Sequence, residues 1–273
     1  MSGTALILAA HGSRVDPTIS AQLRDYADRI VRLKLFHEVV VAFHRGEPTF
    51  AGVLDQLQAD DVIVVPVMTS DGYYCDVVLP QELPKNQRFP QIHLRQTPPV
   101  GAYPSMICLV ERRIRQLTRE YGLEPDGVCV AVVGHGTPRH PRSRSTTVRL
   151  AEGLQGLELG REVLYAFLGE DPGVQSIVDR ATADAVIVIP FLISGGPHAT
   201  VDIPSRLGLQ TPPGATPPFH GRVGDRLVVC DAAVGTYPEI IDMIVDLAIS
   251  APPIRTRSAS DGPCTVRGAE TAR

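Results

Sequence analysis

Short apolar runs alternate with amphipathic segments along this chain. Residues 5–10 and 128–133 are continuously apolar, the pattern of a strand that is buried on both faces. Residues 23–33 instead repeat apolar positions at helical spacing, with charged residues between them. Strands that alternate with helices predict parallel βαβ units with right-handed crossovers.

The same series of segments occurs twice at a fixed offset. Residues 10–13 (AHGS) match residues 134–137 (GHGT), an offset of 124 (135 − 11 = 124). Residues 62–66 (VIVVP) match residues 186–190 (VIVIP) in the same register. An internal duplication therefore predicts two tandem parallel-sheet domains of similar fold.

The elements predicted between these matches are also paired. Each half has a second strand, a further helix and a third strand that ends in Ser-x-Gly. In the two halves the second strand is expected at 39–43 and 163–167, and the further helix at 49–58 and 173–181.

Towards the end of each half the offset grows to 134 (237 − 103 = 134). The second half therefore holds about ten extra residues, which the Pro/Gly-rich stretch 211–224 supplies. We expect an N-terminal domain at 1–122, a C-terminal domain at 127–253 and a disordered tail at 254–273, where the sequence is polar and aperiodic.

Composition excludes several classes of protein. The 273 residues are 44% apolar and 21% charged, with a formal net charge of −4, so a soluble globular protein without a nucleic-acid footprint is expected. No apolar run approaches the roughly 18–20 residues of a membrane span. The first apolar run leads directly into the repeat and predicts a strand, not a signal peptide.

The cysteines favour a reducing, cytoplasmic location. There are five of them and no CxxC pair, which argues against a disulfide framework or a zinc ribbon. Cys108, Cys129 and Cys230 lie in apolar segments and are expected to be buried, whereas Cys75 lies in a repeat loop.

Polar residues with chemical potential follow the predicted strands, where ligands bind in open parallel sheets. The candidates, which follow the first, second and third strands, are His11 and His135, then Glu47, Glu170 and Asp171, then Tyr74 and His198. In the second half this set is His, Glu/Asp, His. Two imidazoles and a carboxylate suit a divalent first-row metal that must still exchange ligands. One histidine could equally act as a base near neutral pH, and a lone His-Gly could simply be a turn.

Several arginines follow His135, namely Arg139, Arg142, Arg144 and Arg149. This local positive patch favours an anionic ligand with several carboxylates, although a solvated loop explains it equally well. His37, His44 and His93 lie close to strands and are assigned no role. No phosphate-binding GxGxxG or GxxxxGK[ST] motif occurs. A histidine phosphatase would need Arg before His-Gly, where Ala10 and Gly134 stand.

The repeated motifs resemble those of the class II tetrapyrrole chelatases, whose members include sirohydrochlorin cobaltochelatases and ferrochelatases of cobalamin and sirohaem biosynthesis. The resemblance extends from Leu6 to about Ala248. It rests on LILAAHGSR, AFHRGEPTF and VIVVPVMTSDGYY in the first half and on VVGHGTPR, AFLGEDPGV and VIVIPFLISGG in the second. The most specific motif is residues 196–204 (GPHATVDIP).

The resemblance implies two flavodoxin-like halves that face one another across a cleft holding a planar tetrapyrrole. The two histidines of the family match His135 and His198, and its acidic residue matches Glu170, with Asp171 as the alternative. These three would handle the incoming metal and the pyrrole protons without ATP. The metal, Co²⁺ first or Fe²⁺, would be a substrate, and no permanently bound cofactor is expected.

The first half departs from the family pattern because Tyr74 stands in place of the second histidine. We therefore expect metal insertion on the C-terminal half, with His11 and Tyr74 facing the tetrapyrrole or helping its deprotonation. Arg139 and Arg142 would bind its carboxylates, and Cys75 is an alternative soft ligand. The rival interpretation is a non-catalytic carrier of metal or tetrapyrrole. The expected partners are the tetrapyrrole and the metal, with no nucleic acid or membrane, and the chain is expected to be a monomer or a homodimer.

Overall fold

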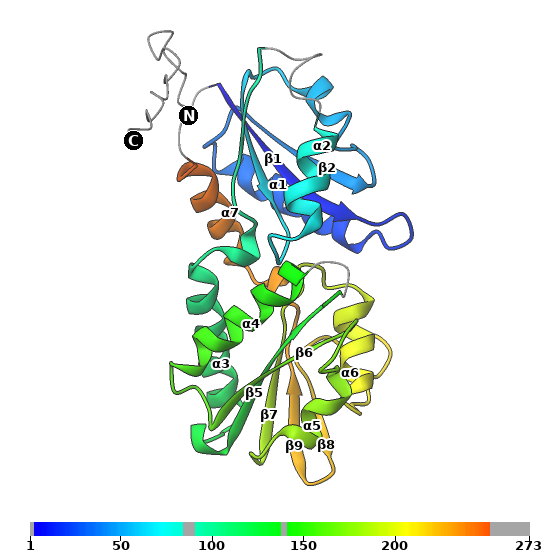
Figure 1. Cartoon of the computed structure of the whole chain (residues 1–273), viewed down its shortest axis with the longest axis vertical. Helices are drawn as coiled ribbons and strands as arrows, with labels where there is room; N and C mark the ends of the chain where they lie inside the picture. The colour runs from blue at the N-terminus through cyan, green and yellow to red at the C-terminus, as the bar shows by residue number, and fades with distance from the viewer. Residues whose placement is uncertain (1–2, 84–90, 138–140, 252–273) are drawn as a thin grey trace, which may run out of the picture.

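The computed structural model describes residues 3–83, 91–137 and 141–251. The tail predicted at 254–273 and Arg139 lie outside these residues. The structure contains two separate sheets, one above the other in Figure 1. The first sheet has the strand order β2-β1-β3-β4 and is entirely parallel. Its strands are β1 (Thr4–Gly12), β2 (Glu38–Arg45), β3 (Asp61–Pro66) and β4 (His93–Gln96).

The second sheet repeats this order and adds one strand at its edge. Its order is β6-β5-β7-β9-β8, and the pairs other than β8–β9 are parallel. Its strands are β5 (Val128–Gly134), β6 (Glu162–Phe167), β7 (Ala185–Pro190), β8 (Phe219–Val223) and β9 (Arg226–Cys230). The predicted insertion at 211–224 thus contains β8, which pairs antiparallel with β9 and corrects the expectation of a purely parallel sheet.

The strand register confirms the internal duplication. Ala9 pairs with Ala42 in the first sheet, and Val133 pairs with Ala166 in the second, at the same offset of 124 (133 − 9 = 124). The apolar runs at 5–10 and 128–133 are almost completely buried, as their patterning predicts.

The principal helices are α1 (Thr18–Arg32), α3 (Ser105–Glu120), α4 (Pro141–Gln155) and α7 (Ile240–Ile249). The shorter ones are α2 (Leu79–Glu82), α5 (Ile177–Arg180) and α6 (Ile203–Arg206). The helix predicted at 173–181 is present as a 3₁₀ turn (Val174–Ser176) that continues into α5, whereas the helix predicted at 49–58 was too long. Phe50 N donates to Phe43 O at 3.0 Å, which keeps the start of the latter segment extended and leaves only a 3₁₀ turn at Val53–Gln56.

The two halves exchange their last helices. In Figure 1, α3 lies beside the second sheet and α7 lies beside the first. Helix α3 contacts α4 and β7, whereas α7 contacts α1 and β3. The division predicted at 1–122 and 127–253 therefore follows the repeat along the chain but does not separate the packed units. One cluster of buried residues runs through both units, from Leu6 of β1 to Val130 of β5 and Ile244 of α7.

Cysteine burial agrees with expectation at two of the three positions. Cys129 and Cys230 are buried, but Cys108 is exposed. Helix α3 is amphipathic and buries Met106, Leu109 and Val110, so the residue between them faces outward. Among the described residues, no helix is long and apolar enough to cross a membrane.

Candidate functional site

The two histidines predicted in the C-terminal half lie together. His135 directly follows β5, and His198 begins a π-helical turn (His198–Asp202) after β7. Their ring centroids are 5.2 Å apart and their planes meet at 83°. Single-turn π-helices occur frequently at functional sites. The structure therefore brings the carboxyl ends of two neighbouring strands together as the repeat pattern predicts.

Each of these imidazoles is oriented through Nδ1. His135 Nδ1 lies 2.9 Å from the carbonyl oxygen of Gly136, and His198 Nδ1 lies 2.6 Å from Oδ2 of Asp202. A carbonyl oxygen can only accept, so Nδ1 of His135 donates. The neutral rings then carry their lone pairs on Nε2, the arrangement that a metal ligand or a proton acceptor needs.

Glu170 packs closely against Gly136, the residue after His135. Gly136 has φ of 66°. A Cβ there would lie 2.9 Å from both Cγ and Oε1 of Glu170, so only glycine allows this contact. Oε1 of Glu170 is buried and has no hydrogen-bond partner, and Oε2 is 4.0 Å from Arg144 Nη1. A buried carboxylate oxygen without a partner is costly unless a proton or cation joins it.

Asp171, the alternative acidic residue, is exposed, and its carbonyl oxygen accepts a hydrogen bond from Arg144 at 2.6 Å. The geometry therefore favours Glu170. No three His, Cys, Asp or Glu side chains within the described ranges are close enough to hold a metal ion together. His135 and His198 thus form a two-imidazole pair with a carboxylate nearby, and not a preformed three-ligand centre.

The first half carries a cluster of rings at the corresponding edge. The centroids of His11 and Tyr74 are 4.4 Å apart with planes at 89°. His44, at the end of β2, lies 5.6 Å from His11 and 5.3 Å from Tyr74. Its Nδ1 is 2.9 Å from Oε1 of Glu82. Sequence reasoning assigned His44 no role and did not consider Glu82, although His44 stands at the strand edge where the other candidates were sought.

Burial lowers the pKa of His11 below its usual value, and His44, Arg45 and His135 lower it further, while the carbonyl of Gly12 opposes the change. His11 is therefore neutral near pH 7 and can accept a proton. The contribution of His135 comes from the other half, so the two ring clusters lie within electrostatic range of one another.

Equivalent residues of the two halves make contacts across the interface between them. Gln22 of α1 donates to the carbonyl oxygen of Ile193 at 2.8 Å, and Thr146 of α4 donates to Oδ1 of Asp71 at 3.1 Å. Gln22 and Thr146 are equivalent positions (146 − 22 = 124). The first helix of each half thus contacts the loop after the third strand of the other half, and these loops lead to Tyr74 and His198.

The arginines that follow His135 are partly engaged by protein groups. Arg142 Nη1 lies 2.5 Å from Asp76, and Arg149 Nη2 lies 3.6 Å from Asp71, both across the interface. Arg144 lies over the ring of Phe167 at 4.8 Å. Arg142 thus pairs the halves in this structure, and its role toward substrate carboxylates stays a prediction.

Cys75 is buried, and burial raises the pKa of its thiol to about 12. Because the thiolate is the metal-binding form, this residue does not suit the soft-ligand role considered for it. Gln96 donates to its carbonyl oxygen at 2.9 Å.

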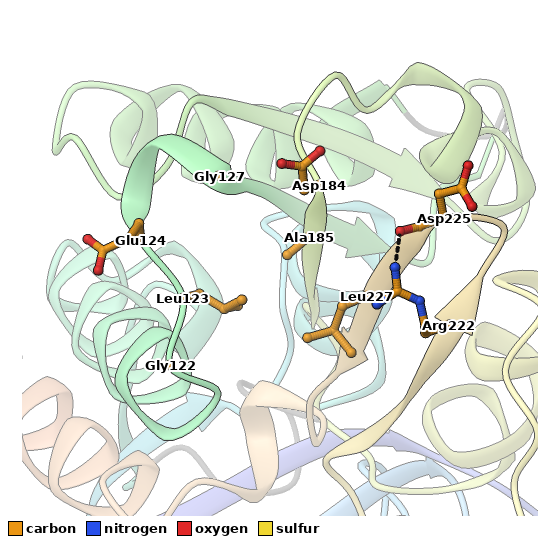
Figure 2. Close-up of a pocket in the computed structure, with 9 residues that line it drawn as sticks. All are labelled: Gly122, Leu123, Glu124, Gly127, Asp184, Ala185, Arg222, Asp225 and Leu227. Atoms are coloured by element: carbon orange, nitrogen blue, oxygen red, sulfur yellow. Dashed lines mark hydrogen bonds between the residues drawn. The ribbon is translucent and has the colours of Figure 1, made fainter.

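A cavity of about 530 Å³ lies at the opposite, amino-terminal edge of the second sheet (Figure 2). It is bordered by the segment before β5 and the starts of β7 and β9, and Arg222 there donates to the carbonyl oxygen of Asp225 at 2.6 Å. None of the predicted site residues lines it. A second cavity, of about 390 Å³, lies between α1 and α7 and is also remote from the histidines.

Fold and site together define a duplicated α/β protein whose two halves carry imidazoles at the carboxyl ends of parallel strands. The chain belongs to the CbiX family, whose model matches residues 5–117 and 129–251. It is 30% identical over 269 residues to a probable sirohydrochlorin cobaltochelatase of Halobacterium salinarum, a match that covers 90% of this chain and 91% of the relative.

Solved structures share the fold. CbiX, described as the terminal enzyme for biosynthesis of siroheme in denitrifying bacteria, superposes with a TM-score of 0.70 at 22% identity, over 92% of this chain and all of that one. SirB from Bacillus subtilis with Fe³⁺ gives 0.68 at 17% identity, over 89% and 93%. DR2241 from Deinococcus radiodurans, a multi-domain protein with structural similarity to chelatases, gives 0.68 at 23%, over 90% of this chain, which spans 54% of that protein.

Proposed function

We propose that this protein inserts a divalent metal, Co²⁺ first or Fe²⁺, into sirohydrochlorin, and that the C-terminal half carries the reaction. The observation that carries the proposal is the His135–His198 pair, with both Nδ1 atoms held by oxygens. A buried Glu170 oxygen without a hydrogen-bond partner lies against Gly136, the residue after His135. The name of the Halobacterium relative supports the substrate and the metal.

The chemistry balances without ATP. A free tetrapyrrole holds two pyrrole N–H protons, and both leave as a 2+ ion enters the ring. Nε2 of a neutral His135 or His198 ring can bind the ion before it enters the tetrapyrrole, or can accept one of these protons. Glu170 offsets positive charge beside them. The protein must leave part of the coordination shell of the ion unfilled, because the ion has to be released into the ring. The metal is therefore a substrate here and not a resident cofactor.

His11 is the further proton acceptor in this proposal, since burial keeps it neutral near pH 7. Tyr74 packs edge-on against it and forms part of the surface that faces the macrocycle. Arg142 would bind a carboxylate of the tetrapyrrole in place of Asp76, its partner in this structure.

The experiment follows metal insertion by the absorption spectrum of sirohydrochlorin with Co²⁺ and, in parallel, Fe²⁺. We expect His198→Ala to lower the rate by roughly a hundredfold, within the range for loss of a general base, and His37→Ala, an exposed histidine outside the site, to leave it unchanged. Insertion at the uncatalysed rate by the unmodified protein would refute the chelatase proposal. Full activity in His198→Ala with none in His11→Ala would place the reaction in the other half.

A matched pair of variants tests the acidic residue. Glu170→Gln removes the charge of the buried oxygen, and Asp171→Asn removes that of its exposed neighbour. A charge-assisted contact contributes about 1.5–3 kcal/mol, so we expect insertion to slow roughly tenfold to a hundredfold in the first variant only. The reverse order would assign the role to Asp171.

A further inference from the structure

The N-terminal half reproduces the arrangement of the His135–His198 pair with a different second histidine. His11 Nδ1 lies 2.8 Å from the carbonyl oxygen of Gly12, and His44 Nδ1 lies 2.9 and 3.0 Å from the carboxylate oxygens of Glu82. Both neutral rings therefore keep their lone pairs on Nε2, as His135 and His198 do. In each half, one ring is held by the next residue's carbonyl and the other by a carboxylate.

The repeat register shows that the histidine–carboxylate pair occupies different positions in the two halves. Tyr74 and Val78 stand where the second half has His198 and Asp202, so the first half lacks that pair. His44 and Glu82 supply it from the end of β2 and the end of α2.

At the positions equivalent to His44 and Glu82, the second half has Leu168 and Arg206 (168 − 44 = 124; 206 − 82 = 124). Arg206 Nη1 donates to the carbonyl oxygen of Leu168 at 2.7 Å. Those two positions therefore supply no imidazole or carboxylate in the second half. Each half thus contains one imidazole pair, built from different positions of the repeat.

Ring separations fit a shared metal ion. An imidazole bound through Nε2 at about 2.1 Å places its centroid about 3.2 Å from the metal, so two rings at a tetrahedral angle are about 5.2 Å apart. The His135–His198 separation is 5.2 Å and the His11–His44 separation is 5.6 Å. Tyr74 packs against the rings of both His11 and His44, and the ring centroid of Phe50 lies 6.4 Å from that of His44.

We propose that the N-terminal half binds a divalent first-row transition metal between Nε2 of His11 and Nε2 of His44, with Glu82 positioning the His44 ring. Water completes the coordination, because the described residues supply no third His, Cys, Asp or Glu ligand. Two imidazoles suit Co²⁺, Ni²⁺, Cu²⁺ or Zn²⁺. This site shares His11 with the proposed function, in which Nε2 of His11 accepts a proton only while no metal ion is bound to it, and it is otherwise separate from the insertion site at His135 and His198. The proposal concerns equilibrium binding and not turnover.

The test measures equilibrium Co²⁺ binding to the full chain, by dialysis with metal analysis and by the visible absorption of bound Co²⁺. His198→Ala disables the C-terminal pair and should leave one bound ion. Adding His44→Asn should weaken this remaining binding at least tenfold, because the asparagine amide can keep the bond to Glu82 but has no Nε2. Glu82→Gln in the same background should weaken it by roughly ten- to a hundredfold, the usual effect of losing an orienting partner.

The matched control is His37→Asn, which changes an exposed histidine elsewhere and should leave binding unchanged. Long-range ¹H–¹⁵N spectra of the unmodified protein with Zn²⁺ give a second readout that no folding defect can affect. There, Nε2 signals of His11 and His44 should shift together with the metal, and unchanged signals would overturn the proposal.

The outcomes separate this site from the proposed function. If His198→Ala binds no Co²⁺ while the unmodified protein binds one ion, the N-terminal site is refuted and the C-terminal pair stands. Equal binding by His198→Ala with and without His44→Asn refutes it as well. If His44→Asn alone abolishes all binding and His198→Ala changes nothing, the N-terminal site is supported and metal binding at His198 is refuted.

Discussion

Replacing Arg113 by methionine tests whether α3 belongs to the second packed unit, as the structure shows. Arg113 of α3 makes two hydrogen bonds with Asp231, from Nε to Oδ2 and from Nη2 to Oδ1, both of 2.7 Å. Asp231 follows β9 and has no exposed surface. The hydroxyl of Tyr237 also donates to Oδ2, at 2.6 Å. A charged pair thus joins a helix from the first half of the chain to a strand of the second.

The expected cost follows from what the substitution leaves behind. Arg113→Met keeps most of the aliphatic volume but leaves a fully buried carboxylate with Tyr237 as its side-chain partner. Breaking a buried pair from one side costs about 3–5 kcal/mol, against a total of about 5–15 kcal/mol for a typical domain. Asp231→Asn in the same chain removes the stranded charge, so the double variant should regain part of that loss.

Urea unfolding measures these free energies, followed by circular dichroism because the chain contains no tryptophan. Arg115→Met is the control on the same helix. Arg115 pairs with Glu111 near the surface and donates to the carbonyl oxygen of Leu157 at 3.2 Å, and such exposed contacts contribute at most about 1 kcal/mol. If Arg113→Met lowers the free energy of unfolding no more than Arg115→Met does, the charged pair does not fasten α3 to the second sheet and the reasoning fails.

Two further predictions concern thiols and a glycine. At pH 8, iodoacetamide should modify Cys108 at least ten times faster than Cys75, because Cys108 is exposed and burial raises the pKa of Cys75 to about 12; peptide mass spectrometry measures both, and equal rates would contradict the burial. Gly136→Ala should destabilise the protein by more than the cost of its left-handed backbone, about 1–2 kcal/mol, because the new Cβ would lie 2.7 Å from Cβ of buried Phe167, and it should slow metal insertion, because the same Cβ would displace Glu170. Gly156→Ala, with open space around the new Cβ, is the control for both measurements.

The strands could be predicted from the sequence because burial on both faces leaves a continuous apolar run. The duplication supported each prediction, because the run recurs at the equivalent position of the other half. The exchange of α3 and α7 could not be predicted in this way. Periodicity shows that one face of α3 is apolar, but it does not show which sheet that face covers. The buried partner that fastens it, Asp231, lies 118 residues from Arg113, and nothing in the local pattern joins the two.

The side-chain contacts at the candidate sites were also predictable only in part. That His135 and His198 lie together could be predicted, because equivalent positions in a parallel sheet converge at one edge, a property of topology that the repeat reveals. The contact of His44 with Glu82 was not predicted, because comparison of the two halves looks for the same residue at the same position. Their pairing depends on a side-chain contact between β2 and α2, which no register comparison reports.

The asymmetry between the halves also extends to how each loop is held. The loop after β7, which leads to His198, is held from the other half by a neutral hydrogen bond of Gln22 to the backbone of Ile193, and Gln22 also donates to the carbonyl oxygen of Gly235 after β9. The loop that leads to Tyr74 is held mainly by ion pairs of Arg142 and Arg149 with Asp76 and Asp71, in addition to the hydrogen bond from Thr146 to Asp71. Salt screens exposed ion pairs much more than neutral hydrogen bonds. We therefore expect salt to weaken the Tyr74 side of the interface more than the His198 side, and we expect carboxylates of an anionic ligand to compete with Asp71 and Asp76 for these arginines.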